Sequence, residues 1–96
     1  MSAYLIIRCV IHDREKFMRY AQRTAGLVEK FGGQYVVRGG DAETLEGDFG
    51  EGVLVVSKWE SREAAERFWN SDDYREAKAL RQDNASADVV LVSGEG

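Results

Sequence analysis

The chain has 96 residues, of which 44% are hydrophobic and 31% are charged, as is typical of a globular domain. Thirteen basic and seventeen acidic residues give a formal net charge of -4. No cluster of Lys and Arg interrupts that balance, so the sequence predicts no nucleic-acid partner, because such binding requires clustered basic side chains to neutralise phosphates. We expect one domain over residues 1–96.

The N-terminal residues lack the features of a targeting or membrane-spanning segment. Their apolar stretch is short, Arg8 interrupts it, and no small-residue cleavage site follows. No run approaches the ~20 apolar residues needed to span a bilayer. We therefore expect a cytoplasmic protein without a membrane partner. Cys9, the single cysteine, cannot form an internal disulfide, and its apolar neighbours predict a buried core residue.

The first part of the chain predicts a strand followed by a helix. Residues 3–11, AYLIIRCVI, form a β-rich run that is apolar on both of its alternating faces. Asp13 has the features of a helix N-cap. Apolar side chains then recur at three- and four-residue steps from Phe17 to Phe31, which predicts an amphipathic helix of about five turns. The glycine pair at 32–33 ends it.

A glycine-rich segment separates the next two predicted strands. QYVVR, residues 34–38, is the second strand, and we expect the glycines at 39–40 to bend or bulge it. AETLE, residues 42–46, is expected to resume extended structure. GDFGEG, residues 47–52, has the composition of a turn, and VLVVSKW, residues 53–59, predicts the third strand.

The last part predicts a helix broken in two and a final strand. Ser61 begins the helix, Asn70 and Ser71 break it, and Ser71 is the expected N-cap of the second piece. ADVVLVS, residues 87–93, is the last strand. The order is β-α-β-β-α-β, the ferredoxin-like plan of the α+β class, with a four-stranded antiparallel sheet and its helices on one face.

Such a sheet leaves one face without a covering layer. A solvated face should be polar at every second residue, but YLIIRCVI, VLVV and VVLV are apolar on both faces. A bare apolar face of that size is a liability. We therefore expect a homodimer in which two copies pack through their open sheet faces, since symmetric dimers are the commonest assembly. A monomer that offers this face to another partner is the alternative.

The whole chain resembles the domain-of-unknown-function family 1330 of the dimeric α+β barrel superfamily. The resemblance is carried by Tyr4, Asp13, Phe17 and Tyr20, by KFGGQYVVRGG at 30–40, LEGDF at 45–49, SDDY at 71–74, Arg81 and the closing VVLVSG. It implies a homodimer of ferredoxin-like subunits and no particular reaction, since relatives on this scaffold include cofactor-free monooxygenases, muconolactone-isomerase-like proteins and chlorite-dismutase-like haem proteins.

Arg38 and Glu46 are the first candidate site residues. Arg38 ends a strand against two glycines, where its planar guanidinium could hold a carboxylate. Glu46 lies on the far side of the same segment. The two residues either form an ion pair that fixes the bend or flank a pocket for a polar ligand. In a catalytic reading, Glu46 is the candidate base and Arg38 the anion clamp.

Three further residues are candidates for ligand binding. Tyr74 and Arg81 lie seven residues apart, on one helical face, so the Tyr74 hydroxyl could reach a pocket beneath the helix. The alternative is a purely structural aromatic residue. Arg8 lies within an apolar strand and requires a partner, because an unpaired buried charge is costly. A salt bridge at the dimer interface and an anion site are both compatible with this position.

The remaining residues favour no metal or cofactor. His12 precedes the capping Asp13, and neighbours in such a turn usually point apart, so a His–Asp general base is not favoured. One histidine and one cysteine without paired ligand spacing do not predict a zinc site, and no nucleotide-binding motif is present. We therefore expect no cofactor and no metal.

Two function classes remain. The first is a homodimeric small-molecule enzyme or binder with a polar-rimmed pocket between sheet and helices, for which a small organic acid is the expected ligand. The second is a non-enzymatic dimeric interaction or stress-response module. An open cavity near Arg38 favours the first class, and a closed, packed interior there favours the second. The sequence does not decide whether the protein is an enzyme.

Overall fold

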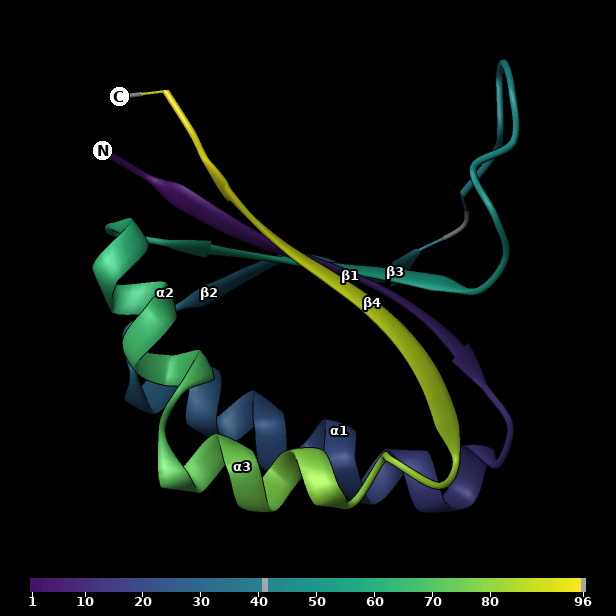
Figure 1. The fold of residues 1–96 in the computed structure, drawn as a ribbon, viewed down its shortest axis with the longest axis horizontal. Coiled ribbons are helices and arrows are strands. Elements are labelled where there is room, and N and C mark those ends of the chain that lie inside the picture. Colours follow the sequence, from purple (N-terminus) through teal and green to yellow (C-terminus); the bar gives the residue numbers. More distant parts are fainter. Residues whose placement is uncertain (41, 96) are drawn as a thin grey trace.

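The computed structural model describes residues 1–40 and 42–95. Four strands form one sheet in the order β2-β3-β1-β4, and every neighbouring pair is antiparallel. All helices lie on one side of this sheet, and the two termini lie at the same end of the molecule (Figure 1). The ferredoxin-like prediction is confirmed. The elements are β1 (Ala3–Ile11), α1 (Arg14–Lys30), β2 (Gln34–Gly40), β3 (Val53–Trp59), α2 (Arg62–Trp69), α3 (Asp72–Ala79) and β4 (Ala85–Ser93).

Side-chain caps fix where the helices begin. Asp13, Ser61 and Ser71 each accept a hydrogen bond from the backbone N–H three residues later, at 3.1, 3.1 and 3.0 Å. These bonds satisfy amide groups that have no partner within the first turn of a helix. The predicted caps Asp13 and Ser71 are therefore confirmed, and Ser61, which the sequence predicts to begin the second helix, also caps it. Ser71 also donates to the carbonyl oxygen of Phe68 at 2.8 Å, which ties the end of α2 to the start of α3.

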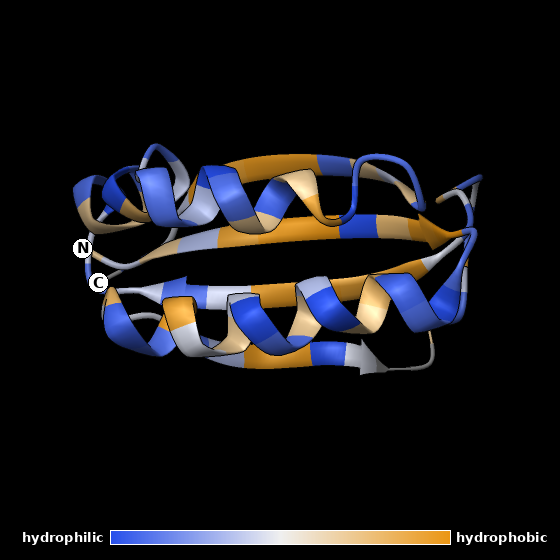
Figure 2. Cartoon of the chain, turned by 90° about the horizontal axis from the view of Figure 1, so that it is seen from below, coloured by the Kyte–Doolittle hydropathy of each residue, from blue (hydrophilic) through white to orange (hydrophobic). Residues whose placement is uncertain are grey.

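The core lies between the helices and the inner face of the sheet. Its largest fully buried side chains are Trp59, Tyr74 and Cys9, so the predicted burial of Cys9 is confirmed. Phe68 lies between Trp59 and Tyr74, with ring centroids 4.9 and 4.7 Å away. The helices turn mainly hydrophilic residues to solvent, whereas the strands behind them are mainly hydrophobic (Figure 2). This two-layer arrangement buries one face of the sheet.

Strand β2 is irregular, and its irregularity sets the direction of the following loop. The pairing with β3 shifts between Tyr35 and Val37 and again between Arg38 and Gly40, so the predicted bulge at the glycine pair is confirmed. Gly39 has a φ of 68°, which glycine adopts readily. The expected extended structure over 42–46 is wrong, because these residues form no strand. The loop instead rises on the side away from the helices (Figure 1).

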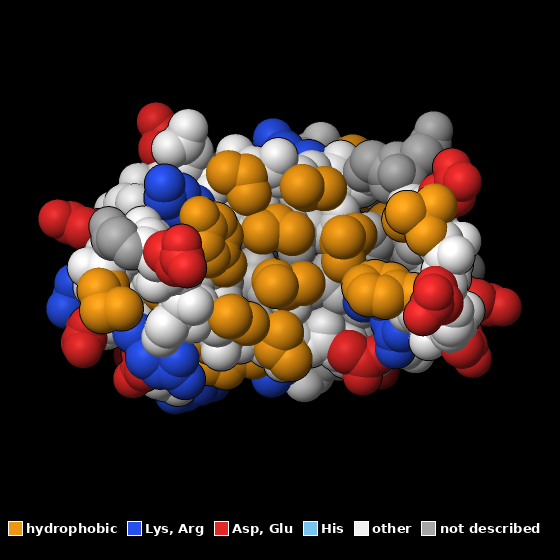
Figure 3. All heavy atoms as spheres, turned by 90° about the horizontal axis from the view of Figure 1, so that it is seen from above, with side chains coloured by type: hydrophobic (Ala, Val, Ile, Leu, Met, Phe, Trp, Pro, Cys, Tyr) orange, Lys and Arg blue, Asp and Glu red, His pale blue; other side chains and the backbone are white. Residues whose placement is uncertain are grey.

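No helix or strand among residues 1–40 and 42–95 covers the opposite face of the sheet. Hydrophobic side chains gather over its centre, and charged side chains lie around the rim (Figure 3). We call this surface the open face. Its apolar residues are partly or largely exposed and comprise Tyr4, Ile6, Val10, Val36, Val37, Leu54, Val56, Val90 and Val92. Their exposure agrees with the sequence argument that both sheet faces are apolar.

Substitution of two glycines by alanine tests the backbone conformation at Gly52 against a helical control at Gly26. Gly52 has a φ of 106°, and a Cβ there would overlap the carbonyl group of Cys9, so Gly52→Ala should lower the free energy of unfolding by about 1–3 kcal/mol. Gly26, within α1, has open space around it, so Gly26→Ala should raise stability by about 1 kcal/mol. Urea unfolding measures both changes. Equal effects of the two substitutions would contradict the backbone assignment at Gly52.

Candidate functional site

A cavity of about 330 Å³ lies between α1 and the inner face of the sheet. This volume is at the lower end of the range for small-molecule sites. Most of the lining is apolar or aromatic, and its polar side chains come mainly from α1, β2 and α3. The residues are Leu5, Ile7, Cys9, Ile11, Arg14, Phe17, Met18, Tyr20, Ala21, Thr24, Val28, Tyr35, Arg38, Gly39, Val53, Val55, Ser57, Phe68 and Tyr74.

The charges around the cavity differ from those of the whole chain. Arg14 and Arg38 line it, and no Asp or Glu is among the described lining residues, although the chain carries a formal net charge of -4. Neither arginine takes part in an ion pair within residues 1–40 and 42–95. The cavity is therefore locally cationic in an acidic protein.

Two tyrosine hydroxyls meet at the wall of the cavity. The Tyr20 and Tyr74 oxygens are 3.0 Å apart, and Nη2 of Arg81 donates to the Tyr74 oxygen at 3.4 Å. All three side chains are buried, with 5%, 1% and 6% of their surfaces exposed. The Arg81 guanidinium also lies 5.3 Å from the Tyr20 ring centre, within reach of a cation–π contact. We call Tyr20, Tyr74 and Arg81 the tyrosine–arginine cluster.

Local structure explains how distant residues form this cluster. Tyr20 faces inward from the middle of α1, whereas Tyr74 lies in the first turn of α3, three residues after its capping Ser71. Arg81 follows the end of α3, and its side chain reaches back to Tyr74 as the seven-residue spacing predicts. The packing of α1 against α3 thus brings the two hydroxyls together.

Two buried polar atoms beside the cavity have no hydrogen-bond partner among the described residues. They are Oγ1 of Thr24 and Nε of Arg81. Thr24 lines the cavity one turn after Tyr20 on the same face of α1. Buried polar groups in native proteins almost always have a partner. An unpaired hydroxyl on a cavity wall therefore indicates a place where a ligand could bind.

Burial and neighbours change the acidity of several groups. Burial, followed by the nearby Tyr20, raises the pKa of Tyr74 well above its usual value, and the same two causes raise the pKa of Tyr35. Burial also raises the pKa of the Cys9 thiol. Burial, the largest single influence, lowers the pKa of Arg81, but the hydrogen bonds and charge interactions with Tyr74 and Tyr20 together outweigh it, so the net shift is upward. At neutral pH the tyrosines are hydrogen-bond donors beside a guanidinium cation.

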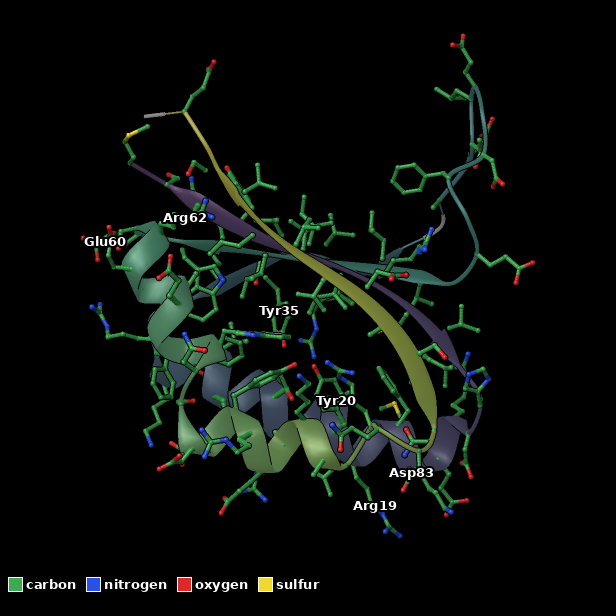
Figure 4. The ribbon with its side chains drawn as sticks, viewed as in Figure 1. Arg19, Tyr20, Tyr35, Glu60, Arg62 and Asp83 are labelled. Carbon is green, nitrogen blue, oxygen red and sulfur yellow. The ribbon has the colours of Figure 1, made fainter. Side chains whose placement is uncertain are left out.

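Tyr35 and Arg38 reach the cavity from β2. Tyr35 points from the sheet and Tyr20 from α1 into the space between the two layers (Figure 4). The Arg38 guanidinium lies 4.5 Å from the centre of the Tyr35 ring, which is a cation–π distance. Arg38 is solvent-exposed overall and lines the cavity, so it reaches both the cavity and solvent.

The structure brings some predicted site residues together and separates others. Arg38 and Tyr74 line one cavity, and Arg81 contacts it through Tyr74. Glu46 lies exposed in the loop, outside the described lining, and no ion pair joins it to Arg38 among the described residues. The loop leaves the sheet on the side away from the helices and carries Glu46 away from the cavity (Figure 1).

Arg8 lies on the open face and not in the cavity. Its Nη2 forms an ion pair with Asp88 at 2.7 Å, and its Nη1 donates to the carbonyl oxygen of Phe49 at 2.7 Å. Asp88 stands directly opposite Arg8 in the β1–β4 register. Arg8 thus has a partner in its own chain, and it anchors the loop to the edge of the open face.

No metal centre is evident around the remaining candidates. The His12 ring lies 3.1 Å from the Ser86 hydroxyl, whereas Asp13 caps α1, so the two neighbours have separate partners. Within the described residues, no group of three or more His, Cys, Asp or Glu side chains is placed to hold a metal ion. No helix in that part of the chain is long and apolar enough to cross a membrane.

Tyr20 and Thr24 are site residues that the sequence analysis did not identify. In the sequence both fall within the apolar periodicity of the first helix, and Tyr20 is otherwise noted only as part of the family resemblance. Their spacing of four residues places two hydroxyls one above the other on the buried side of α1. Paired hydroxyls on an otherwise apolar helical face are a usable signal, because a buried hydroxyl requires a partner.

The fold and cavity define a ferredoxin-like α+β protein with an internal cavity beneath its sheet. The family model described as "Domain of unknown function (DUF1330)" matches residues 2–95, and the chain belongs to this family. No curated protein matches it in sequence.

Solved structures share the fold at low sequence identity. A protein of unknown function from Rhodopseudomonas palustris is 17% identical with a TM-score of 0.78, and the match covers 99% of this chain and 83% of that one. SnoaB, a cofactor-independent oxygenase from Streptomyces nogalater, is 14% identical with a TM-score of 0.65, over 99% and 94% of the two chains. A dimeric ferredoxin-like protein of unknown function from Jannaschia is 13% identical with a TM-score of 0.69, over 98% and 100%.

The raised pKa of Tyr74 predicts how stability depends on pH. A group whose pKa is higher in the folded state than in the unfolded state makes its full contribution to stability at pH values below its unfolded-state pKa, which is about 10 for tyrosine. This contribution is lost as the pH rises above that value. The free energy of unfolding should therefore fall above about pH 10, and less steeply for Tyr74→Phe than for the wild type. Urea unfolding at a series of pH values measures these slopes.

A Tyr74→Phe slope equal to that of the wild type would contradict the assignment.

Proposed function

We propose that this protein is a homodimeric small-molecule enzyme or binder whose site is the cavity between α1 and the sheet. The observation that carries the proposal is a cavity of about 330 Å³ whose mainly apolar lining includes several hydroxyl-bearing side chains and two arginines. Few polar groups converging in an apolar cavity are typical of small-molecule sites. The non-enzymatic alternative called for a closed interior near Arg38, whereas Arg38 lines this cavity.

Each predicted residue has a different place in this proposal. Tyr74 forms part of the cavity wall that faces the ligand, Arg81 acts through Tyr74, and Arg38 holds ligand charge at the cavity wall. Glu46 lies in an exposed loop outside the described lining, so we propose no catalytic role for it in the cavity of its own chain. Arg8 fixes the loop beside the open face and lies outside the described lining of this cavity, so we assign it no contact with a ligand there.

The side chains of the cavity support chemistry without a bound metal. Among the described lining residues, only Cys9 belongs to the Cys, His, Asp and Glu set, and one such ligand does not make a metal site. Proton transfer on a small organic acid and cofactor-free oxygenation both fit hydroxyl donors in an apolar cavity. SnoaB, which is described as a cofactor-independent oxygenase, has the same fold, although a shared fold is an analogy and no proof of a shared reaction.

The open face supports the homodimer. Val90, Val36 and Val92 are 52%, 50% and 43% exposed on it, and exposed apolar patches mark interaction sites. A second copy offers the same apolar surface, so the two faces bury each other in an isologous interface. The Jannaschia protein with this fold is described as dimeric. In this arrangement each cavity lies on the far side of its sheet from the interface.

Filling the cavity should abolish ligand binding. Ala21 lines it, so Ala21→Trp places an indole in the space a ligand would use, whereas Gln22→Trp adds the same ring at an exposed position of α1. We expect aromatic fragments to bind the wild type and Gln22→Trp, but not Ala21→Trp. Saturation-transfer NMR with equal numbers of anionic, neutral and cationic fragments measures this. No fragment binding to the wild type, or unchanged binding to Ala21→Trp, would contradict the proposed function.

A charge on the open face should dissociate the dimer. Val90→Asp places a carboxylate in the apolar centre of the proposed interface, where its desolvation is costly. Leu80→Asp makes the same kind of change at a residue that is 38% exposed at the end of α3. We expect the mass of two chains for the wild type and Leu80→Asp, and of one chain for Val90→Asp, in sedimentation equilibrium. A single-chain mass for the wild type at micromolar concentration would overturn the dimer.

A further inference from the structure

The cavity wall contains a buried positive charge without a balancing carboxylate. Arg81 is 6% exposed, forms no ion pair among the described residues, and leaves its Nε without a partner. Its side-chain hydrogen bond to Tyr74 spans a long 3.4 Å. A buried guanidinium without a carboxylate partner destabilises the folded protein, because the charge loses its hydration and gains no ion pair in return. An anion bound nearby would remove that cost.

Counting protons shows what the two tyrosines offer to a ligand. Each neutral hydroxyl has one proton, and an arginine side chain can only donate. The bond between Tyr20 and Tyr74, 3.0 Å long, uses one of the two hydroxyl protons. The Arg81 bond uses a lone pair on the Tyr74 oxygen and none of those protons. One hydroxyl proton is therefore left without an acceptor in the cluster, whichever tyrosine carries it.

The free proton belongs to the cavity side of the cluster. Tyr20 and Tyr74 both line the cavity, whereas Arg81 lies behind them. When Tyr74 donates to Tyr20, the bonds run in one direction, from Arg81 through Tyr74 to Tyr20, and each bond polarises the next. The terminal hydroxyl is then a strengthened donor. The unpaired Thr24 hydroxyl stands one turn away on α1 and supplies a second donor.

We propose that Tyr20, Tyr74 and Thr24 form the head-group site of this cavity and that it binds one anionic oxygen group, a carboxylate or an enolate-type oxygen, on a compact aromatic or aliphatic body. The inference rests on the proposed function and deepens it by assigning the ligand's charge and orientation. Tyr20 and Thr24 contact the anionic group. Arg81 is a positioning residue, which acts by orienting and polarising the Tyr74 hydroxyl.

The rest of the lining fits the same ligand. Arg14 and Arg38 contribute further positive charge, and no acid is among the described lining residues. Phe17, Phe68 and Tyr35 supply aromatic surface for an apolar body. A cationic ligand would find no carboxylate there. A neutral ligand could accept hydrogen bonds from the hydroxyl groups, but it would gain little electrostatic stabilisation from the buried guanidinium.

Matched probes test the charge of the head group. Benzoate and 2-naphthoate are compared with their carboxamides and primary alcohols, which keep the ring and remove the charge. Isothermal titration calorimetry on the full chain measures each affinity. We expect at least one carboxylate to bind at least about tenfold more tightly than its amide and alcohol, since hydrogen bonds to charged groups are the stronger ones.

Four substitutions then identify the groups responsible. Tyr20→Phe and Tyr74→Phe keep the rings, and each should lower carboxylate affinity by about tenfold while amide affinity changes by less than about threefold. Arg81→Met should remove the preference for carboxylate over amide, and Arg81→Lys should restore part of it. Arg19→Met removes an exposed charge on α1 that points away from the cavity (Figure 4) and should change neither affinity.

The outcomes separate this inference from the proposed function. A carboxylate preference that disappears in the tyrosine variants supports both, even where Arg81→Met fails to fold. Amides or alcohols that bind as well as carboxylates would leave the small-molecule site in place and overturn the anionic head group. A carboxylate preference unchanged in Tyr20→Phe and Tyr74→Phe would overturn the cluster as its cause. Absence of binding by all six probes and by the fragment collection would overturn both proposals.

Discussion

The organisation of this molecule depends on a four-stranded sheet that is apolar on both faces while its own chain covers only one. The connections place α1, α2 and α3 together on the inner side. One layer of helices is enough to bury Leu5, Cys9 and Trp59, but no element is left for the outer side. We therefore propose separate uses for the two faces, a ligand cavity on the inner side and an assembly surface on the outer side.

The inner layer is filled unevenly, and this leaves room for the cavity. Trp59, Phe68 and Tyr74 form an aromatic stack between the sheet and the α2–α3 corner, and Nε1 of Trp59 donates to Ser57 at 2.9 Å. Beneath α1, by contrast, the strands contribute mainly aliphatic side chains such as Val53 and Val55. The cavity lies beside these smaller side chains. Well-packed interiors contain few such voids, so this cavity is a candidate ligand site.

The sequence predicted the elements better than the site, for a physical reason. Caps and strand limits are local: Asp13 and Ser71 bond to amides three residues away, and the β-rich composition of residues 3–11 predicts a strand without tertiary information. The Tyr20–Tyr74 bond joins residues 54 positions apart and depends on how α1 packs against α3. The position of Glu46 likewise depends on the path of a loop, which composition alone does not determine.

Local electrostatics explains how an acidic protein can hold an anion. Surface carboxylates are screened by salt over a Debye length of about 8–10 Å, so the formal net charge of -4 acts weakly inside the cavity. Arg81 is buried among apolar and aromatic side chains, where screening is far weaker. Its field therefore dominates at the adjacent hydroxyls. A ligand that enters with a single negative charge exchanges bulk water for two oriented hydroxyl donors backed by a cation, and this exchange favours anions over their neutral analogues.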